Sequence, residues 1–96
     1  MDRVTIKGTS EGLVITLGEG PLHEVTAELE ARLRGKASFF RGGRVALHVG
    51  DRPLSAEQLQ EIGSLLESLG MGLWAVGSDH PTTLVAIREL GLESIV

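Results

Sequence analysis

The chain has 96 residues, of which 42% are hydrophobic and 23% are charged, and its formal net charge at pH 7 is −4. This length fits a single domain, and the composition is that of a folded globular protein, which excludes disordered and fibrous chains. Negative net charge argues against non-specific binding to nucleic acid or to an anionic membrane surface. The sequence contains no cysteine, which excludes disulfides and thiolate chemistry.

The first elements predicted along the chain are two strands joined in a hairpin. Apolar and polar residues alternate in 4–7, and residues 13–17 form an apolar, β-branched run, as is typical of strands. Gly8 and Gly12 bracket the turn between the two strands, and glycine is free to take the positive φ of a tight turn. We therefore expect an antiparallel pair at the start of the chain.

The next element is an amphipathic helix over residues 21–35. It begins with a proline, places leucines and valine on one face at helical spacing, and ends at a glycine. On the opposite face, Arg32 follows Glu28 by four residues, a spacing at which the two side chains can pair. The pattern predicts that Arg32 is exposed to solvent.

The second half of the chain alternates strands with helices. Residues 44–50 and 72–78 have the short, β-rich composition of strands, and we expect the first of them at the centre of the sheet. Residues 55–70 predict a helix that begins with a capping box at Ser55, and residues 81–91 predict a last helix between a proline and a glycine.

The predicted order is ββαβαβα. Connections from strand to helix to strand imply parallel neighbours with right-handed crossovers, whereas the opening hairpin is antiparallel. The sequence therefore predicts a single small α/β domain with a mixed sheet opened by a hairpin and helices packed on it.

No group of residues points to catalysis. The phosphate-binding patterns GxGxxG and GxxxxGK[ST] are absent from the sequence. His23, His48 and His80 lie on three different predicted elements, so they have no metal-ligand spacing. Acidic pairs such as Glu57 and Glu61 lie on the solvent side of a helix, where no cavity encloses them. We expect no enzyme activity, no cofactor and no metal.

The N-terminus lacks the apolar segment of a signal peptide, and the apolar runs are far shorter than the roughly 20 residues that span a bilayer. We therefore expect a cytoplasmic protein without direct membrane insertion.

The basic segment of residues 32–44 carries five Lys and Arg and no acid, so the rest of the chain has a net charge of −9. It also holds the adjacent aromatic residues Phe39 and Phe40. In an extended segment these would point to opposite sides, and one of them is expected to face outward. Either the core and the surrounding loop cover both rings, or an exposed ring forms an anchor for an acidic protein partner. The basic residues beside that ring are Arg32, Lys36 and Arg41.

The stretches VTIKGTSEGLVITLG, ELEARLRG, SFFRG and RVALHVGDRPLS together resemble the N-terminal domain of the bacterial septum-site determining protein MinC family. The resemblance covers nearly the whole chain and includes the KG turn after the first strand. One departure is that Gly42, Gly43 and Arg44 stand where the family commonly has Ala-Pro.

This resemblance implies an inhibitor of the division septum that binds the tubulin-like protein FtsZ and antagonises its filaments. The family positions implicated in that contact match Gly8, Arg32 and Phe39, and the basic segment adds Arg41 as a candidate. For Gly8 a structural explanation stands beside the functional one, because a substitution could distort the turn.

The resemblance further implies that residues 1–96 form the N-terminal domain alone. Family members of full length have a C-terminal domain, expected to be absent here, that dimerises and binds the ATPase MinD. Recruitment to the membrane would occur only through MinD. A homodimer of the domain itself, formed through the exposed edge of the hairpin, stays open.

Two alternatives remain beside this hypothesis. The first is a phosphoserine-regulated binding module resembling the anti-sigma-factor antagonists, in which a phosphate on Ser55 would meet helix N–H groups. The second is an enzyme subunit that contributes to a shared site, which would require a small molecule bound beyond the strand ends.

Overall fold

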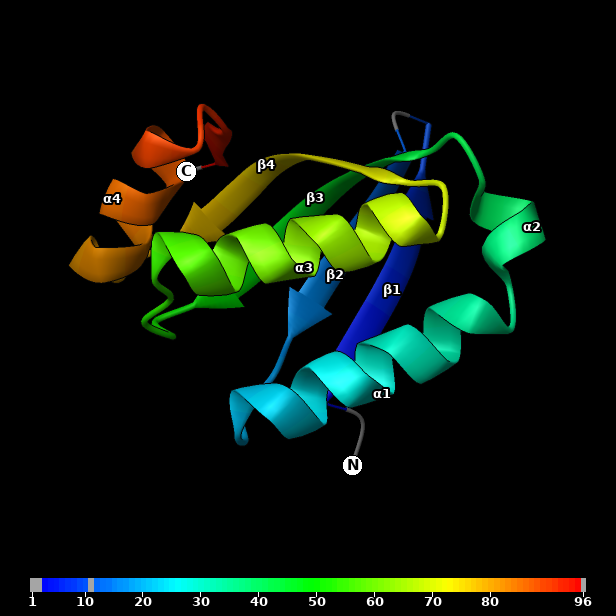
Figure 1. Ribbon diagram of the computed structural model, residues 1–96, viewed down its shortest axis with the longest axis horizontal. Coiled ribbons are helices and arrows are strands. Elements are labelled where there is room, and N and C mark those ends of the chain that lie inside the picture. The colour runs from blue at the N-terminus through cyan, green and yellow to red at the C-terminus, as the bar shows by residue number, and fades with distance from the viewer. Residues whose placement is uncertain (1–2, 11, 96) are drawn as a thin grey trace.

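Figure 1 shows the computed structural model, which describes residues 3–10 and 12–95, apart from the side chains of Ala37 and Phe39. In chain order its elements are β1 (Val4–Thr9), β2 (Gly12–Leu17), α1 (Leu22–Arg34), α2 (Ala37–Phe40), β3 (Arg44–Gly50), α3 (Ala56–Ser68), β4 (Gly72–Ser78), α4 (Pro81–Glu89) and β5 (Glu93–Ile95). In this part of the chain, no helix is long and apolar enough to cross a lipid bilayer.

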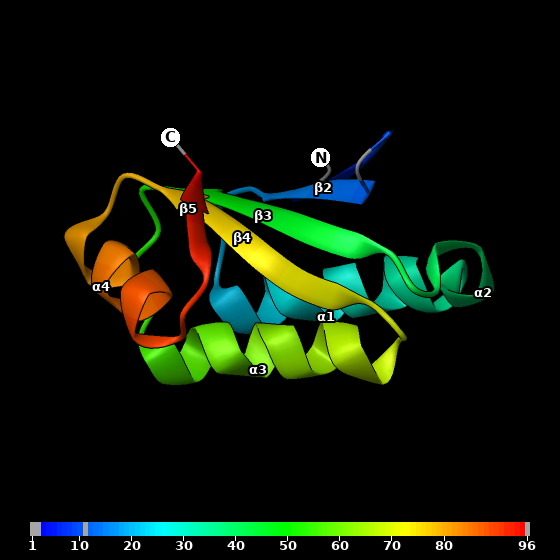
Figure 2. The same ribbon diagram turned by 90° about the horizontal axis from the view of Figure 1, so that it is seen from above.

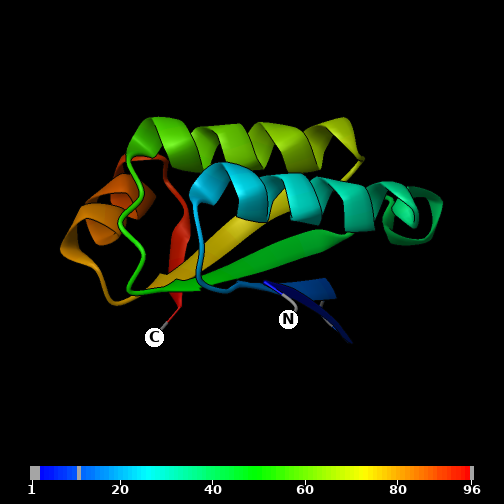
Figure 3. The same ribbon diagram turned by 90° about the horizontal axis from the view of Figure 1, so that it is seen from below.

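The predicted α/β class and mixed sheet are confirmed. The five strands lie in the order β1-β2-β3-β4-β5, with β1 antiparallel to β2 and all other neighbours parallel. Because the strands follow chain order and the crossovers are right-handed, the connecting helices lie on one face of the sheet. Figures 2 and 3 show α1 and α3 side by side on that face, with α4 at the β5 end, and among the described residues no helix lies over the opposite face.

Two short elements were not predicted from the sequence. The helix α2 has four residues and the strand β5 has three, both too short to show a periodic pattern. Strand β5 pairs with β4 in parallel and forms one edge of the sheet, while β1 forms the other edge.

The core lies between the sheet and the helices. The central strand β3 buries Val45, Leu47 and Val49 on the helix face, each at most 3% exposed. The buried stripes that pack there are Val25, Leu29 and Leu33 of α1 and Leu59, Ile62 and Leu66 of α3. Each such side chain contributes about 1.5–3 kcal/mol of burial free energy, which makes these stripes the main attachment of the helices to the sheet.

The helix α3 begins with the predicted capping box. The Ser55 hydroxyl accepts a hydrogen bond from the Gln58 backbone N–H at 3.1 Å, and the Gln58 side-chain oxygen accepts one from the Ser55 N–H at 2.9 Å. Both bonds satisfy backbone donors that the helix itself leaves unpaired. Ser55 is therefore a structural cap in this fold.

Only one of the two hairpin glycines has a backbone conformation that other residues rarely adopt. Gly12 has φ of 138°, and a Cβ there would lie 2.4 Å from the Arg44 carbonyl oxygen. Gly8 is a strand residue paired with Leu13, its φ is not positive, and a Cβ there would meet no atom within 4 Å. The expectation that a substitution of Gly8 distorts the turn has no support in this geometry.

The prediction that the two phenylalanines lie in an extended segment is wrong. Residues Ala37–Phe40 form the helical turn α2, in which the Phe40 N–H donates to the Lys36 carbonyl at 3.1 Å. Gly35, at the end of α1, keeps right-handed helical angles of −66° and −16°, and Lys36, with φ of −131°, separates α1 from the new helical turn. Consecutive residues of a helix point about 100° apart, not to opposite sides.

Phe40 is partly buried and packs against the core. The side chain of Phe39 lies outside the described part of the chain, so the prediction that one of the two rings faces outward stays a prediction.

The two hairpin glycines provide a matched stability test. We expect Gly12→Ala to lower the free energy of unfolding by about 2 kcal/mol or more, because alanine is strained at this φ and overlaps the Arg44 carbonyl. Gly8→Ala is expected to change it by less than about 1 kcal/mol, because the strand geometry there suits alanine. Urea unfolding followed by circular dichroism measures both, and equal losses would contradict the turn geometry.

Candidate functional site

A hollow beside the hairpin brings together residues from three separate elements. It has a volume of about 310 Å³ and is lined by Ile6, Gly8, Arg32, Lys36 and Phe40. Strand β1 supplies the first two, the last turn of α1 supplies Arg32, and α2 with its preceding residue supplies the others. We call these five residues the basic corner.

The side of β1 that faces the helices contributes Ile6 and Gly8. Val4 on this strand is fully buried, and alternation along the strand places Ile6 and Gly8 on the same side as Val4. Because Gly8 has no side chain and its Cβ position is unobstructed, any larger residue at position 8 would project into the hollow. The glycine therefore keeps the basic corner open.

Arg32 connects α1 to the edge strand of the sheet. Its Nη1 donates a hydrogen bond to the backbone carbonyl of Val4, on the same strand as Gly8. Because a guanidinium group has five N–H donors, this single bond holds the side chain beside β1 and leaves donors for a partner. The predicted exposure of Arg32 is confirmed.

The predicted pair of Glu28 with Arg32 is wrong. A Glu28 carboxylate oxygen accepts from the backbone N–H of Arg3 at 3.1 Å, while Arg32 turns toward β1. The pair at a spacing of four residues is instead Arg34 with Glu30, at 2.6 Å. The positive charge of Arg32 is therefore not neutralised by the acidic residue one turn before it.

The five basic residues of the segment 32–44 separate in the fold. Arg44 lies on the sheet face opposite the helices, with its guanidinium carbon 4.5 Å from the centroid of the Trp74 ring. Arg41 lies against the turn between α3 and β4, where its Cγ is 3.1 Å from the position of a Cβ on Gly70. Of these cations, only Arg32 and Lys36 line the basic corner.

Four residues were proposed from the sequence as a partner-binding set, and the structure brings together Gly8 and Arg32. Arg41 is not among the residues that line the hollow. For Phe39 only the backbone position within α2 is described, directly before Phe40, whose side chain lines the hollow.

The sequence reasoning placed Lys36 beside one of the two phenylalanine rings, but it missed Ile6 and did not predict that strand β1 contributes to the same hollow. The sequence held a weak signal that Lys36 lies near Arg32, because Lys36 directly follows the glycine that ends α1. That both residues lie close to β1 depends on how α1 packs on the sheet.

The chemistry of the basic corner is that of a contact surface. Two cations surround an apolar floor formed by Ile6 and Phe40. Among residues 3–10 and 12–95, no three His, Cys, Asp or Glu side chains are grouped to hold a metal ion. Arginine beside a partly buried aromatic ring is the composition typical of protein-binding hot spots. The complementary surface would be acidic and would contribute an apolar group.

Ser55, the candidate for regulation by phosphorylation, lies far from this corner. It caps the start of α3, at the end of the molecule opposite α2 (Figure 1).

Phe40 has a structural role beside any binding role, because it packs against the core. We expect Phe40→Ala to lower the free energy of unfolding by about 1–3 kcal/mol, less than for a fully buried phenylalanine. Phe40→Leu, which keeps most of the apolar volume, is expected to lose about half as much. Thermal unfolding of the three proteins measures this, and an unchanged stability of Phe40→Ala would contradict the packing described here.

Comparison with known proteins yields a consistent set of relatives. The family model described as "Septum formation inhibitor MinC, N-terminal domain" matches residues 4–73, which include the whole basic corner. The chain is 39% identical over 95 residues to "Probable septum site-determining protein MinC" of Symbiobacterium thermophilum, covering 95% of this chain and 41% of that protein.

Proteins with the same name in Gloeobacter violaceus and Moorella thermoacetica are 36% identical over 92 residues and 35% identical over 71 residues. These matches cover 94% and 73% of this chain, but only 33% and 32% of the two relatives. The chain therefore spans less than half the length of the curated relatives that it matches.

Proposed function

The chain belongs to the family of the septum formation inhibitor MinC, N-terminal domain, and we propose that it inhibits septum formation by binding FtsZ and antagonising the assembly of FtsZ filaments. It acts by occupying a protein surface, and no covalent bond is made or broken. In this proposal the domain is one component of the Min system that places the division site.

The basic corner is the proposed FtsZ-binding surface. The observation that carries this assignment is that Gly8 and Arg32, two positions pointed out by the family resemblance, line one hollow although they lie on different elements. Phe40 adds an apolar surface between them. Phe39 is proposed as a further contact because it precedes Phe40 in α2, and Arg41 as a peripheral one.

The proposed mechanism has an electrostatic part and an apolar part. Arg32 and Lys36 attract an acidic surface of FtsZ and orient it, which raises the rate of association. An apolar group of the partner then enters the hollow over Ile6 and Phe40, which Gly8 leaves open. Occupation of this FtsZ surface weakens contacts within or between filaments.

The remainder of the full-length relatives is proposed to supply dimerisation and binding to MinD. In that arrangement the domain itself is cytoplasmic and reaches the membrane only through MinD. Self-association of the domain alone is proposed to use β1, which is an edge strand of the sheet.

The test is pelleting of GTP-assembled FtsZ in the presence of this chain. The native chain is expected to lower the FtsZ pellet, and Arg32→Ala and Gly8→Gln are expected to weaken binding by about 2–4 kcal/mol and abolish the effect. Arg34→Ala is the matched control, because Arg34 lies on the same helix but pairs with Glu30 and does not line the corner. Circular dichroism first verifies that all variants are folded.

Equal loss of inhibition in Arg34→Ala and Arg32→Ala would show that only bulk charge matters and would remove the assignment to the basic corner. Direct binding to FtsZ, measured by fluorescence anisotropy, separates a failure to bind from binding that does not disassemble filaments.

A further inference from the structure

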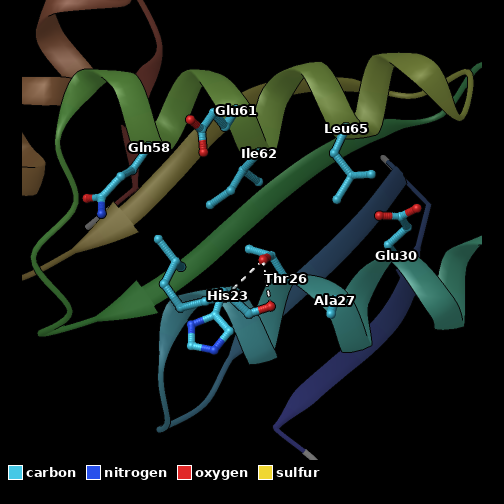
Figure 4. Close-up of a pocket in the computed structure, with 9 residues that line it drawn as sticks. His23, Thr26, Ala27, Glu30, Gln58, Glu61, Ile62 and Leu65 are labelled. Atoms are coloured by element: carbon cyan, nitrogen blue, oxygen red, sulfur yellow. Dashed lines mark hydrogen bonds between the residues drawn. The ribbon is translucent and has the colours of Figure 1, made fainter.

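A second hollow lies on the helix layer, away from the basic corner. The helices α1 and α3 leave a groove between them with a volume of about 600 Å³ (Figure 4). Its apolar floor consists of Ile62, which is 2% exposed, and of the partly buried Leu22 and Leu65, which pack against the core. No residue lines both this groove and the basic corner.

The groove runs along both helices for about two turns. The residues that line it are His23, Thr26, Ala27 and Glu30 on α1 and Gln58, Glu61, Ile62 and Leu65 on α3, as Figure 4 shows. Residues spaced three and four apart lie on one helix face, so each wall is a continuous ridge about 10 Å long. This shape matches a third helix laid into the groove, with its own apolar side chains at spacings of three, four and seven residues.

The rim of the groove is acidic. Its charged side chains are Glu30 and Glu61, one from each wall. Helix α3 contains no Lys or Arg, and α1 contains none before its last turn. Glu30 already pairs with Arg34 at 2.6 Å, whereas Glu61 makes no ion pair within the described part of the chain. The groove thus has the charge opposite to that of the basic corner.

Polar groups in the groove are largely engaged with their own helices. The Thr26 hydroxyl donates to the Leu22 carbonyl at 3.0 Å, and the Gln58 side-chain oxygen accepts from the Ser55 N–H. The walls therefore do not present a converging set of donors and acceptors such as a small polar ligand requires. The groove instead offers an apolar floor bordered by the carboxylates of Glu30 and Glu61.

From this apolar floor and acidic rim, we propose that the groove between α1 and α3 is a docking site for a basic amphipathic helix of a partner protein. Leucine-like side chains of that helix pack on Ile62 and Leu65, and its lysines or arginines meet Glu61 and Glu30. The proposal does not rest on the FtsZ-binding function, because it concerns a different surface with the opposite charge.

The probe is a synthetic helical peptide with leucines at spacings of three, four and seven residues, flanked by lysines. Its twin has glutamates in place of the lysines. By fluorescence anisotropy at low salt, we expect the lysine peptide to bind this chain at least about tenfold more tightly than the glutamate twin. Amide chemical-shift changes in ¹H–¹⁵N spectra are expected to concentrate on α1 and α3.

A pair of charge reversals on α3 tests the site itself. Glu61→Lys is expected to weaken binding of the lysine peptide by at least about fivefold, since it replaces an attraction at the rim with a repulsion. Glu67→Lys makes the same change in net charge on the same helix, but position 67 does not line the groove, and its effect is expected to stay within about twofold. Both residues are exposed, so both variants are expected to fold.

Several results would overturn the proposal. Equal weakening by the two reversals, or equal binding of the two peptides, would mean that no specific site exists. Shift changes centred on the basic corner or on the open sheet face would move the site elsewhere.

Self-association of the chain without peptide, with shift changes in both the groove and α4, would instead identify the occupant as a second copy. Helix α4 carries the exposed apolar residues Leu84 and Val85, which are 38% and 56% exposed.

Discussion

Right-handed crossovers in a sheet whose strands follow chain order place every connecting helix on the same face. This constraint determines where each functional candidate lies. It sets the end of α1 beside the edge strand β1, where the basic corner forms, and it sets α1 next to α3, where the groove forms. The same constraint leaves the other sheet face open, with Arg44 over Trp74.

The bond from Arg32 to the Val4 carbonyl shows how packing overrides a local preference. Within an isolated helix, Glu28 and Arg32 would pair, and such pairs contribute only about 0.2–0.5 kcal/mol. A backbone carbonyl on the adjacent edge strand offers a charge-assisted hydrogen bond instead. As a result, Arg32 lies beside β1 in the basic corner, and Glu28 instead accepts a hydrogen bond from the backbone N–H of Arg3.

The two hollows have opposite chemical character. Arg32 and Lys36 surround one of them, while Glu30 and Glu61 border the other. Such a separation of charge on a small domain allows two partners of opposite charge to bind without competing for the same surface. The net charge of −4 is a sum over the whole chain and describes the charge of neither hollow.

The sequence by itself determined the regular elements, because periodicity, caps and turn residues are local properties: the stripes of α1 and α3, the capping box at Ser55 and the hairpin turn at Gly12 all follow from spacing. It did not reveal α2 or β5, which are too short for a period to appear.

Gly8 was named from the family resemblance, and Arg32 from both the basic segment and the resemblance, but their meeting with Ile6, Lys36 and Phe40 was decided only by tertiary structure. The separation of Arg41 and Arg44 from that group was decided in the same way. The reason is physical: neighbours in sequence diverge when a strand alternates its faces or a helix turns, and residues far apart meet only where packed elements bring them together.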